Sequence, residues 1–512
     1  MVLSIRGLKS AGLKNLMIQI NDRLNVQRDD VDFSELGVEV SLVEQISTQI
    51  SLYLDGHPAA ASQRSQSLED KLEALQSHFT WDLQPSRSKL TDLRIILEDI
   101  GTDEGNFWLG HIYNLLGFIQ YQLGSSEDAL KLFNRATETF RQKNADEGPW
   151  LMVNFGNLAW LHHHRGEDEK SEDYLSKVDG LMRRYPAPPE LERHPEVLAE
   201  KAWTLMKFDK EKKLEAAELF QGAIRMQPDI VEWQSSYAIL STEFLTKRQI
   251  ILEPEDFERL KSAKEQDPGN LYVAALYLEA KAAGGEQIQE EARELADRIL
   301  ERPPSSYNGN RPLLRLYRNQ ISKDEAVQLA EEALRRHPNS RYLKKSAAIC
   351  HMKSILYPDH QELQPSCIVV NRAISLWEEM MAAYGDSSLR RQITLAELYS
   401  KVNQEKSHQI YKGLLREDLD PERKQILYSC YAKHLFFVRK QSRKSTLYHM
   451  RAAEIPVESN YRQKSITELE KTIRRTRNPE LIEEIENLLT NLRNSACSSE
   501  SVNIEDLNLK II

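Results

Sequence analysis

Cysteine is scarce in this sequence, and so are the other features from which covalent frameworks or membrane spans are built. The chain of 512 residues has four widely spaced cysteines and no Cys-x-x-Cys pair. This excludes a disulfide framework and a thiolate metal site, and it favours a reducing, cytoplasmic setting. The 20 glycines and 19 prolines are too few for a fibrous or low-complexity chain. No apolar run reaches the roughly 18 residues of a membrane helix, so we expect no integral membrane protein.

Motifs that carry catalysis or bind a phosphate cofactor are also missing. Gly284-Gly285 lacks the preceding strand and the following Lys-Ser/Thr of a phosphate loop, and no Gly-x-Ser-x-Gly elbow occurs. The run His162-His163-His164 is tempting, but consecutive residues point in different directions around a helix, whereas a helical zinc pair needs a spacing of i, i+4. We interpret it as packing and surface residues. The sequence predicts no enzyme, no cofactor and no metal site.

Charge of one sign dominates only locally. The chain has 68 Lys and Arg against 78 Asp and Glu, a net charge of −10, which argues against a general coat for nucleic acid. Residues 421–477, however, hold 14 Lys and Arg and only five acids. A solvated helix face is one interpretation, and a surface that follows a phosphate backbone is the other. We call the following residues the basic rail: Arg439, Lys440, Arg443, Lys444, Lys471, Arg474 and Arg475.

From about residue 106 the sequence repeats with the spacing of tetratricopeptide units. In one unit, Tyr113 is followed by Leu116-Gly117, a turn glycine and Ala129-x-x-x-Phe133. Because one helical hairpin cannot bury its own apolar face, such hairpins stack on one another. We predict an all-α tetratricopeptide-repeat superhelical solenoid, with interrupting non-repeat helices where the intervals are irregular. Prolines that cannot continue a helix close four of the later units: Pro228, Pro268, Pro304 and Pro338.

The sequence suggests five segments, of which the boundary at residue 67 is implied by the family resemblance described below. The first 21 residues contain Arg6, Lys9 and Lys14 and no acid, which fits either a transit peptide or a poorly ordered extension. The predicted segments are an N-terminal extension of uncertain order (1–66), an N-terminal repeat subdomain (67–230), a central one (231–365), a C-terminal basic one (366–480) and a tail (481–512).

Four stretches resemble a known family. They are Ser67-Leu68-Glu69-Asp70-Lys71-Leu72, His78-Phe79-Thr80-Trp81-Asp82-Leu83, Asn114-Leu115-Leu116 and Gly156-Asn157-Leu158-Ala159-Trp160. Together they resemble the interferon-induced proteins with tetratricopeptide repeats, and the similarity runs over about residues 67–477. This resemblance implies a cytoplasmic antiviral protein of innate immunity that holds the 5′ end of single-stranded viral RNA, a triphosphate or an incompletely methylated cap, in a positively charged tunnel. It implies sequestration of that RNA from translation.

The resemblance also implies roles for individual residues. Trp203 is similar to an aromatic residue that stacks on a cap base, and Lys207 to a lysine that contacts phosphate. Tyr272 is similar to a tyrosine of the tunnel, and Arg311 and Arg318 to arginines that contact the triphosphate. Each has a simpler interpretation as a packing or ion-pair residue. The basic rail would guide the RNA body.

The chain departs from the family pattern at two places. Glu243 stands where 5′-end binders carry an arginine, and Lys345-Ser346 replaces a His-Gln pair. A carboxylate that faces a triphosphate is unfavourable unless a cation neutralises it, and we expect Lys345 to be such a cation and part of the RNA site. Arg94 lies near the position of an expected arginine of the first helix.

Two functions remain open from the sequence. One is capture of viral RNA. The other is a protein scaffold that regulates innate immune signalling, with RNA binding lost or secondary. Family paralogues, further copies of this chain and other innate-immunity proteins are the expected protein partners, and no membrane partner is expected.

Overall fold

The computed structural model describes most of the chain as helices. It divides into two compact units, residues 1–73 and 74–512, and the described part of the first contains α4 (Leu68–Glu73). No strand occurs among the described residues, and none of their helices is long and apolar enough to cross a membrane. The described residues are 67–100, 106–144, 146–189, 193–243, 252–305, 307–358, 365–385 and 388–508, with side chains to residue 494 except that of Glu243.

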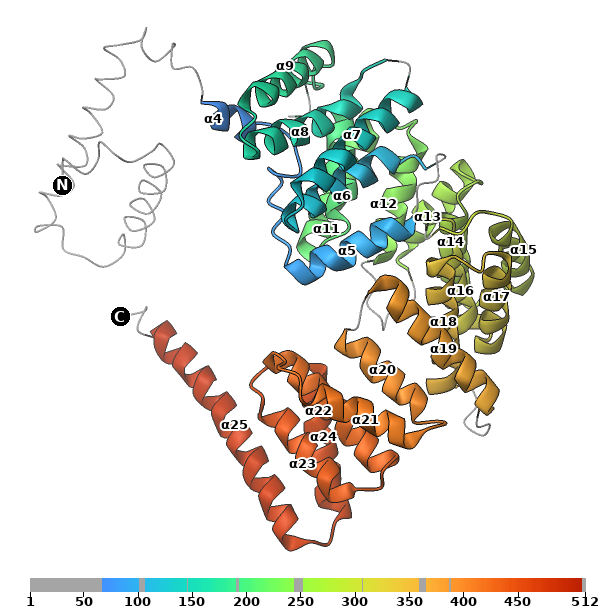
Figure 1. The fold of residues 1–512 in the computed structure, drawn as a ribbon, viewed down its shortest axis with the longest axis vertical. Helices are drawn as coiled ribbons and strands as arrows, with labels where there is room; N and C mark the ends of the chain where they lie inside the picture. Colours follow the sequence, from blue (N-terminus) through green and yellow to red (C-terminus); the bar gives the residue numbers. More distant parts are fainter. Residues whose placement is uncertain are drawn as a thin grey trace, which may run out of the picture. The chain divides into compact units, whose positions relative to one another are not determined.

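The second unit is a succession of helix pairs, each packed on the next (Figure 1). The elements up to the middle of the chain are α5 (Arg87–Ile100), α6 (Leu109–Gln122), α7 (Ser126–Lys143), the 3₁₀ turn η2 (Pro149–Leu151), α8 (Met152–His164), α9 (Asp168–Arg184), α10 (Pro195–Leu205), α11 (Lys210–Met226), α12 (Val231–Glu243) and α13 (Pro254–Gln266). The elements that follow are α14 (Leu271–Ala283), α15 (Gln289–Leu300), α16 (Asn310–Leu316), the π-helical η3 (Tyr317–Ile321), α17 (Lys323–Arg336), α18 (Arg341–Leu356), α19 (Cys367–Tyr384), α20 (Leu389–Tyr399), α21 (Gln404–Leu414), α22 (Pro421–Phe437), α23 (Ser442–Glu454), α24 (Asn460–Arg475) and α25 (Pro479–Asn508).

The hairpin α6–α7 shows why the repeat needs its small residues. A Cβ atom on Gly117 would lie 2.6 Å from the Phe133 ring, so only glycine lets the two helices approach this closely. Ala129 and Phe133 are fully buried, and Gly124 makes the turn with a positive φ of 99°. The spacing that predicted a tetratricopeptide hairpin is therefore confirmed by the packing that it produces.

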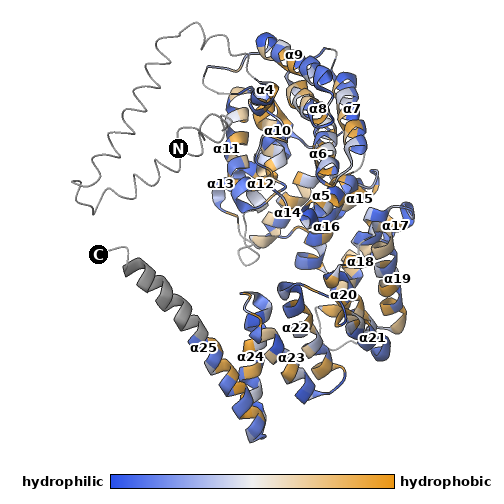
Figure 2. Cartoon of the chain, turned by 60° about the vertical axis from the view of Figure 1, so that its left-hand side comes forward, coloured by the Kyte–Doolittle hydropathy of each residue, from blue (hydrophilic) through white to orange (hydrophobic). Residues whose placement is uncertain are grey.

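The two helices of this hairpin differ in how they meet their surroundings. All eleven residues of α6 from Leu109 to Ile119 are buried, whereas α7 buries one stripe that includes Ala129, Phe133 and Phe140. Figure 2 shows the same contrast, with hydrophilic residues along the outer side of α7 and α9. In this hairpin the first helix is enclosed by its neighbours, and the second helix covers it on one side.

Four helices end shortly before the prolines that the sequence predicts to be the ends of repeat units. Helix α11 ends two residues before Pro228, α13 two before Pro268 and α17 two before Pro338, and α15 ends four before Pro304. Proline has no backbone N–H to donate and disfavours the α conformation of the residue before it. The all-helical repeat architecture is confirmed. The insertion near Tyr357–Pro365 that the sequence predicts falls mostly on residues 359–364, which lie outside the described part of the chain.

The residues that carry the family resemblance form a packed joint between hairpins. The backbone N–H of His78 donates to Asn157 Oδ1 at 2.9 Å, and its ring Nε2 lies 3.2 Å from Thr204 Oγ1. Phe79 stacks on Trp160 with ring centroids 6.0 Å apart. Burial lowers the pKa of His78 to about 3, so the ring is neutral and its hydrogen bonds hold this joint.

A chain of hydrogen bonds crosses the buried interior of the first hairpins. Thr137 Oγ1 lies 2.6 Å from Asn154 Oδ1, Asn154 donates to Asn114 at 2.7 Å, and Asn114 donates to Glu200 Oε1 at 2.8 Å. The four residues come from α7, α8, α6 and α10. Burial raises the pKa of Glu200 to about 8 and lowers that of His111, 3.8 Å away, to about 3. This pair is therefore mostly uncharged at neutral pH.

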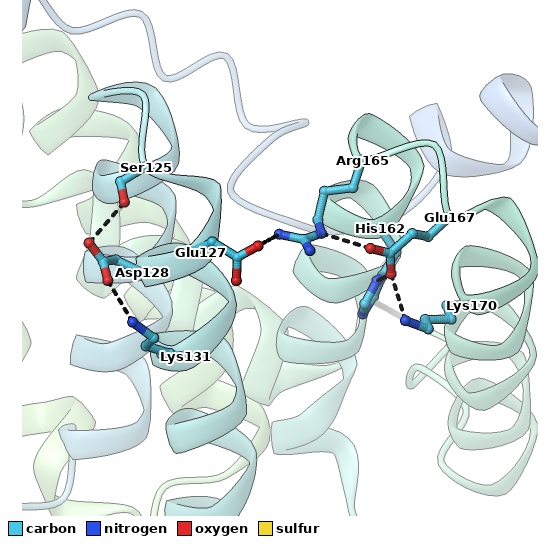
Figure 3. A network of polar contacts seen from close by, with 8 residues as sticks. All are labelled: Ser125, Glu127, Asp128, Lys131, His162, Arg165, Glu167 and Lys170. Atoms are coloured by element: carbon cyan, nitrogen blue, oxygen red, sulfur yellow. Dashed lines mark hydrogen bonds and ion pairs between the residues drawn. The ribbon is translucent and has the colours of Figure 1, made fainter.

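The three consecutive histidines each have a separate neighbour. His162 Nδ1 lies 2.9 Å from Glu167, His163 Nδ1 lies 2.9 Å from Asp168, and the ring of His164 stacks on Trp160. The three rings therefore contact three different neighbours in this structure. Figure 3 shows that Glu167 also binds Arg165, whose guanidinium reaches Glu127 at 2.8 Å and so joins the turns of two successive hairpins.

Glu200 should give the stability of the protein a recognisable pH dependence. Its pKa is about 8 in the folded state against 4.5 for the ordinary carboxyl, so between these values the folded state binds more protons than the unfolded state. The stabilisation from this group is complete below about pH 4.5 and is lost as the pH rises through 8. Glu200→Gln cannot titrate. In urea unfolding from pH 5 to 8, the free energy of unfolding of the native chain should fall relative to the variant by up to about 1.4 kcal/mol per pH unit. A constant difference would contradict a protonated Glu200.

Candidate nucleic-acid interface

Trp203 and Lys207 lie together at the end of α10. The Trp203 ring stacks on Trp108 with centroids 5.5 Å apart and an interplanar angle of 16°, and Lys207 Nζ lies over the Trp203 ring at 4.6 Å. Trp203 is only 2% exposed. In this structure the indole is therefore enclosed by Trp108 and Lys207, in the manner of a packing residue, and neither of its faces is open to a base.

Tyr272 and Arg311 lie close to Tyr342 of α18. Burial raises the pKa of Tyr342; the neighbouring Tyr272 and Asp99 raise it further, while the positive charge of Arg311 opposes the rise. Tyr272 also stacks on Tyr307 with centroids 6.4 Å apart. Arg311 is exposed, and no carboxylate of the described residues forms an ion pair with it. We call Tyr272, Arg311, Tyr342 and Lys345 the α16–α18 group.

Lys345 of this group is already paired with an acid. Its Nζ lies 2.7 Å from Asp99 Oδ2, at the end of α5. Arg341 Nε lies 3.4 Å from the other Asp99 oxygen, which also accepts a hydrogen bond from the Tyr384 hydroxyl at 2.7 Å. The carboxylate that Lys345 neutralises is Asp99, whereas the carboxylate expected from the sequence was Glu243. The Glu243 side chain lies outside the described residues.

Arg318 has a different neighbour. It lies in the π-helical turn η3, where the N–H of Ser322 donates to the Tyr317 carbonyl five residues earlier. Its Nη1 lies 3.3 Å from the sulfur of Cys350. Burial raises the pKa of this thiol and Arg318 opposes the rise, so the sulfur is a neutral partner. The structure therefore does not place Arg318 beside Asp99 with Lys345. Arg94, the candidate of the first helix, lies 3.9 Å from Glu98.

The basic rail is partly neutralised. Arg439 pairs with Glu405 at 3.0 Å and Lys471 with Glu468 at 2.7 Å. Its remaining members are exposed and lie at the end of α22, the start of α23 and the end of α24. Because these three helices alternate in direction, their side chains share one end of the hairpin stack. The exposed members are Lys440, Arg443, Lys444, Arg474 and Arg475.

A second set of cations was missed by the sequence reasoning. Burial and the nearby charge of Glu397 raise the pKa of Cys430 to about 12, and the charges of Lys433, Lys464 and Arg390 oppose the rise. These cations come from α22, α24 and α20, the first helices of adjacent pairs. All three are exposed, and none forms an ion pair with a described carboxylate. We call them the inner cations. Lys433 and Lys464 belong to the basic stretch 421–477, but the charge count did not distinguish them from its other cations.

The cavities found among the described residues lie away from these groups. One, of about 640 Å³, is lined by Glu331, Lys344 and Arg372 of α17 to α19. Another, of about 420 Å³, is lined by Arg225, Tyr237 and other residues of α11 to α13. The α16–α18 group is therefore a surface with charged and aromatic side chains rather than one of these two pockets.

Comparison with known proteins identifies the repeat and its relatives. Residues 108–178 match the family model "Tetratricopeptide repeat". The human "Interferon-induced protein with tetratricopeptide repeats 2" is 25% identical over 422 residues, which cover 79% of this chain and 87% of that protein. The human "Antiviral innate immune response effector IFIT1" is 25% identical over 431 residues, covering 80% and 88%. The resemblance seen in the sequence is thus confirmed over most of the chain.

Solved structures show the same fold. The human IFIT1 dimer with m7Gppp-AAAA aligns with a TM-score of 0.61 and 23% identity, covering 84% of this chain and 97% of that one. The human IFIT1 dimer with PPP-AAAA aligns with a TM-score of 0.58 and 24% identity, covering 83% and 97%. At this identity the comparison establishes the arrangement of helices.

Replacing Trp203 by alanine should destabilise the protein. Removing a buried indole that stacks on Trp108 leaves a cavity, which costs about 3–5 kcal/mol for a large aromatic side chain. Thermal unfolding followed by circular dichroism should show a lower midpoint for Trp203→Ala and a much smaller change for Trp203→Phe, which retains an aromatic ring. A midpoint unchanged by Trp203→Ala would show that the residue is not a packing residue.

Proposed function

We propose that this chain, which is a member of the interferon-induced proteins with tetratricopeptide repeats, binds single-stranded viral RNA and sequesters it from translation. The proposed 5′-end site is the α16–α18 group. The proposed activity is binding and not catalysis, in the cytoplasm and in antiviral innate immunity. Two facts about a relative support it: human IFIT1, which shares the fold, has been solved with PPP-AAAA and with m7Gppp-AAAA.

The observation that carries the proposal is the exposed guanidinium of Arg311. It lies near Tyr342, which also has Tyr272 as a neighbour, and no described carboxylate neutralises it. Arginine offers five donors in a rigid fork that suits phosphate oxygens, and a tyrosine ring offers a face for a base. A cation that no described carboxylate neutralises, beside an aromatic ring, is suited to a 5′-phosphate and its first nucleotide.

A phosphate-bearing 5′ end suits this chain better than recognition of a cap base by Trp203. The Trp203 indole is enclosed by Trp108 and Lys207, so a cap base would first have to displace one of them. Arg311 needs no such displacement to reach a phosphate. We therefore propose a 5′-triphosphate as the preferred end, with Lys207 and Arg318 as further cations toward the same RNA.

The RNA body would then follow the C-terminal hairpins. The inner cations and the exposed part of the basic rail offer positive charge on consecutive helix pairs. Contacts of this kind bind phosphates without reading the sequence. These residues would add affinity for RNA of any 5′ end, whereas the α16–α18 group would distinguish one end from another.

A protein scaffold remains the second candidate function. Phe437 is 67% exposed, Phe436 40% and Leu447 45%, and all three lie on α22 and α23. Neighbouring exposed apolar side chains are typical of surfaces that bind proteins. This surface is compatible with RNA binding elsewhere on the chain, and its partners would be paralogues, further copies of this chain or other innate-immunity proteins.

Arg311→Ala should weaken binding of 5′-triphosphate RNA selectively. A hydrogen bond to a charged group contributes about 1.5–3 kcal/mol, which corresponds to roughly 10- to 150-fold in affinity. Fluorescence anisotropy with a matched RNA that ends in a 5′-hydroxyl should show little loss, because that RNA lacks the contacted group. Arg311→Lys should recover part of the affinity.

Arg475→Ala provides the matched control, because this arginine is exposed but lies in the basic rail. Its loss should weaken both RNAs alike. If Arg311→Ala weakened both RNAs equally while the protein stayed helical by circular dichroism, Arg311 would not belong to a 5′-end site. Binding of neither RNA by the native chain would leave the scaffold as the better function.

A further inference from the structure

The carboxylate of Asp99 is the most enclosed charged group near the proposed site. Its side chain is 2% exposed, yet it comes from α5, 246 residues before its partner Lys345. The carboxylate has three close neighbours from the α18–α19 hairpin: Lys345 Nζ at 2.7 Å, Tyr384 Oη at 2.7 Å and Arg341 Nε at 3.4 Å. The end of α5 is therefore held against the central repeats by charge.

Those neighbours would also suit a phosphate. Two cations and a hydroxyl donor converge on one anion, and Arg341 and Lys345 both lie over the Tyr384 ring at 4.9 Å. Charged donors of this kind bind carboxylate and phosphate oxygens with similar geometry. Arg311 lies in the first turn of α16, Arg341 and Lys345 lie in the first two turns of α18, and these two helices contact each other. The anion site and the exposed arginine are therefore neighbours.

We propose that Asp99 is an internal competitor for the RNA phosphate. In the free protein it occupies Lys345 and Arg341; a 5′-triphosphate that approaches Arg311 displaces it and takes over these cations. The proposal rests on the proposed function, since it concerns the same site, and it names Asp99 as the residue that limits selectivity for the 5′-triphosphate.

Two physical arguments favour exchange over a permanent ion pair. Glu98 lies 3.0 Å from Arg341, so two carboxylates compete for this arginine. A triphosphate carries more charge than either carboxylate and offers more acceptor oxygens. With an internal occupant, the apparent affinity of a ligand equals its intrinsic affinity multiplied by the fraction of time that the site is free. A site occupied nine-tenths of the time would lose about tenfold.

The test compares RNA affinities of the full-length chain and its variants by fluorescence anisotropy. Two matched single-stranded RNAs are used, one with a 5′-triphosphate and one with a 5′-hydroxyl. Asp99→Asn removes the charge but keeps the size of the side chain. We expect it to tighten binding of the triphosphate RNA by about tenfold and to change that of the hydroxyl RNA much less. Unchanged or weaker binding of the triphosphate RNA would overturn the proposal.

A double-mutant cycle separates exchange from a general change of charge. Lys345→Ala in the native background should weaken binding of the triphosphate RNA only in part, because the lost phosphate contact is offset by the lost ion pair with Asp99. In the Asp99→Asn background, Lys345→Ala should abolish most of the increase in affinity for the triphosphate RNA that Asp99→Asn produces. A gain that persists without Lys345 would show that Asp99 acts only through its net charge and would overturn the proposal. Glu331→Gln is the control, since it neutralises a half-buried acid paired with Arg372 at 2.9 Å outside the site.

Tyr384→Phe keeps the proposal testable if Asp99→Asn fails to fold. It removes one hydrogen bond to Asp99 and keeps the ring on which the cations lie. We expect a tightening of a few-fold for the triphosphate RNA alone, and no change or a loss would count against the competitor. If the native chain and every variant bind neither RNA, the proposed function fails. If the native chain binds RNA and these variants do not alter the preference for its end, only the role of Asp99 fails.

Discussion

Each helical hairpin of this protein depends on its neighbours to cover its apolar face. The first helices of the N-terminal hairpins, α6, α8 and α10, have most of their residues buried. Close approach of this kind demands small residues such as Gly117, and it fixes the helices relative to one another within a hairpin. Because first helices lie side by side, their side chains supply both the α16–α18 group and the inner cations from separate repeats.

The residues that reveal the family are structural. His78, Asn157 and Thr204 form a neutral hydrogen-bonded joint, and Phe79 packs on Trp160. Such a joint tolerates little change, since a buried polar group without its partner is costly. The resemblance therefore indicates the fold directly. It indicates the ligand only through residues elsewhere, and those are where this chain departs from the family pattern.

Local features were predictable from the sequence, whereas contacts between distant residues were not. Spacing of small and bulky residues and the positions of Pro228 and Pro338 predicted hairpins and helix ends, because these depend on neighbours a few residues away. The pairing of Lys345 with Asp99 joins residues 246 positions apart. The periodicity of apolar residues in the sequence cannot predict such a contact. The enclosure of Trp203 by Trp108 was hidden for the same reason. A count of charge found the basic rail but could not distinguish paired from exposed members.

The central claim is that the 5′ end of RNA binds across α16 and α18. Hydrogen–deuterium exchange of the full-length chain, with and without a saturating single-stranded 5′-triphosphate RNA, tests it most directly. We expect slower amide exchange in α16 and α18 with the triphosphate RNA, and less of this protection with the matched 5′-hydroxyl RNA. Protection confined to α22–α24 and equal for both RNAs would contradict a 5′-end site on these helices.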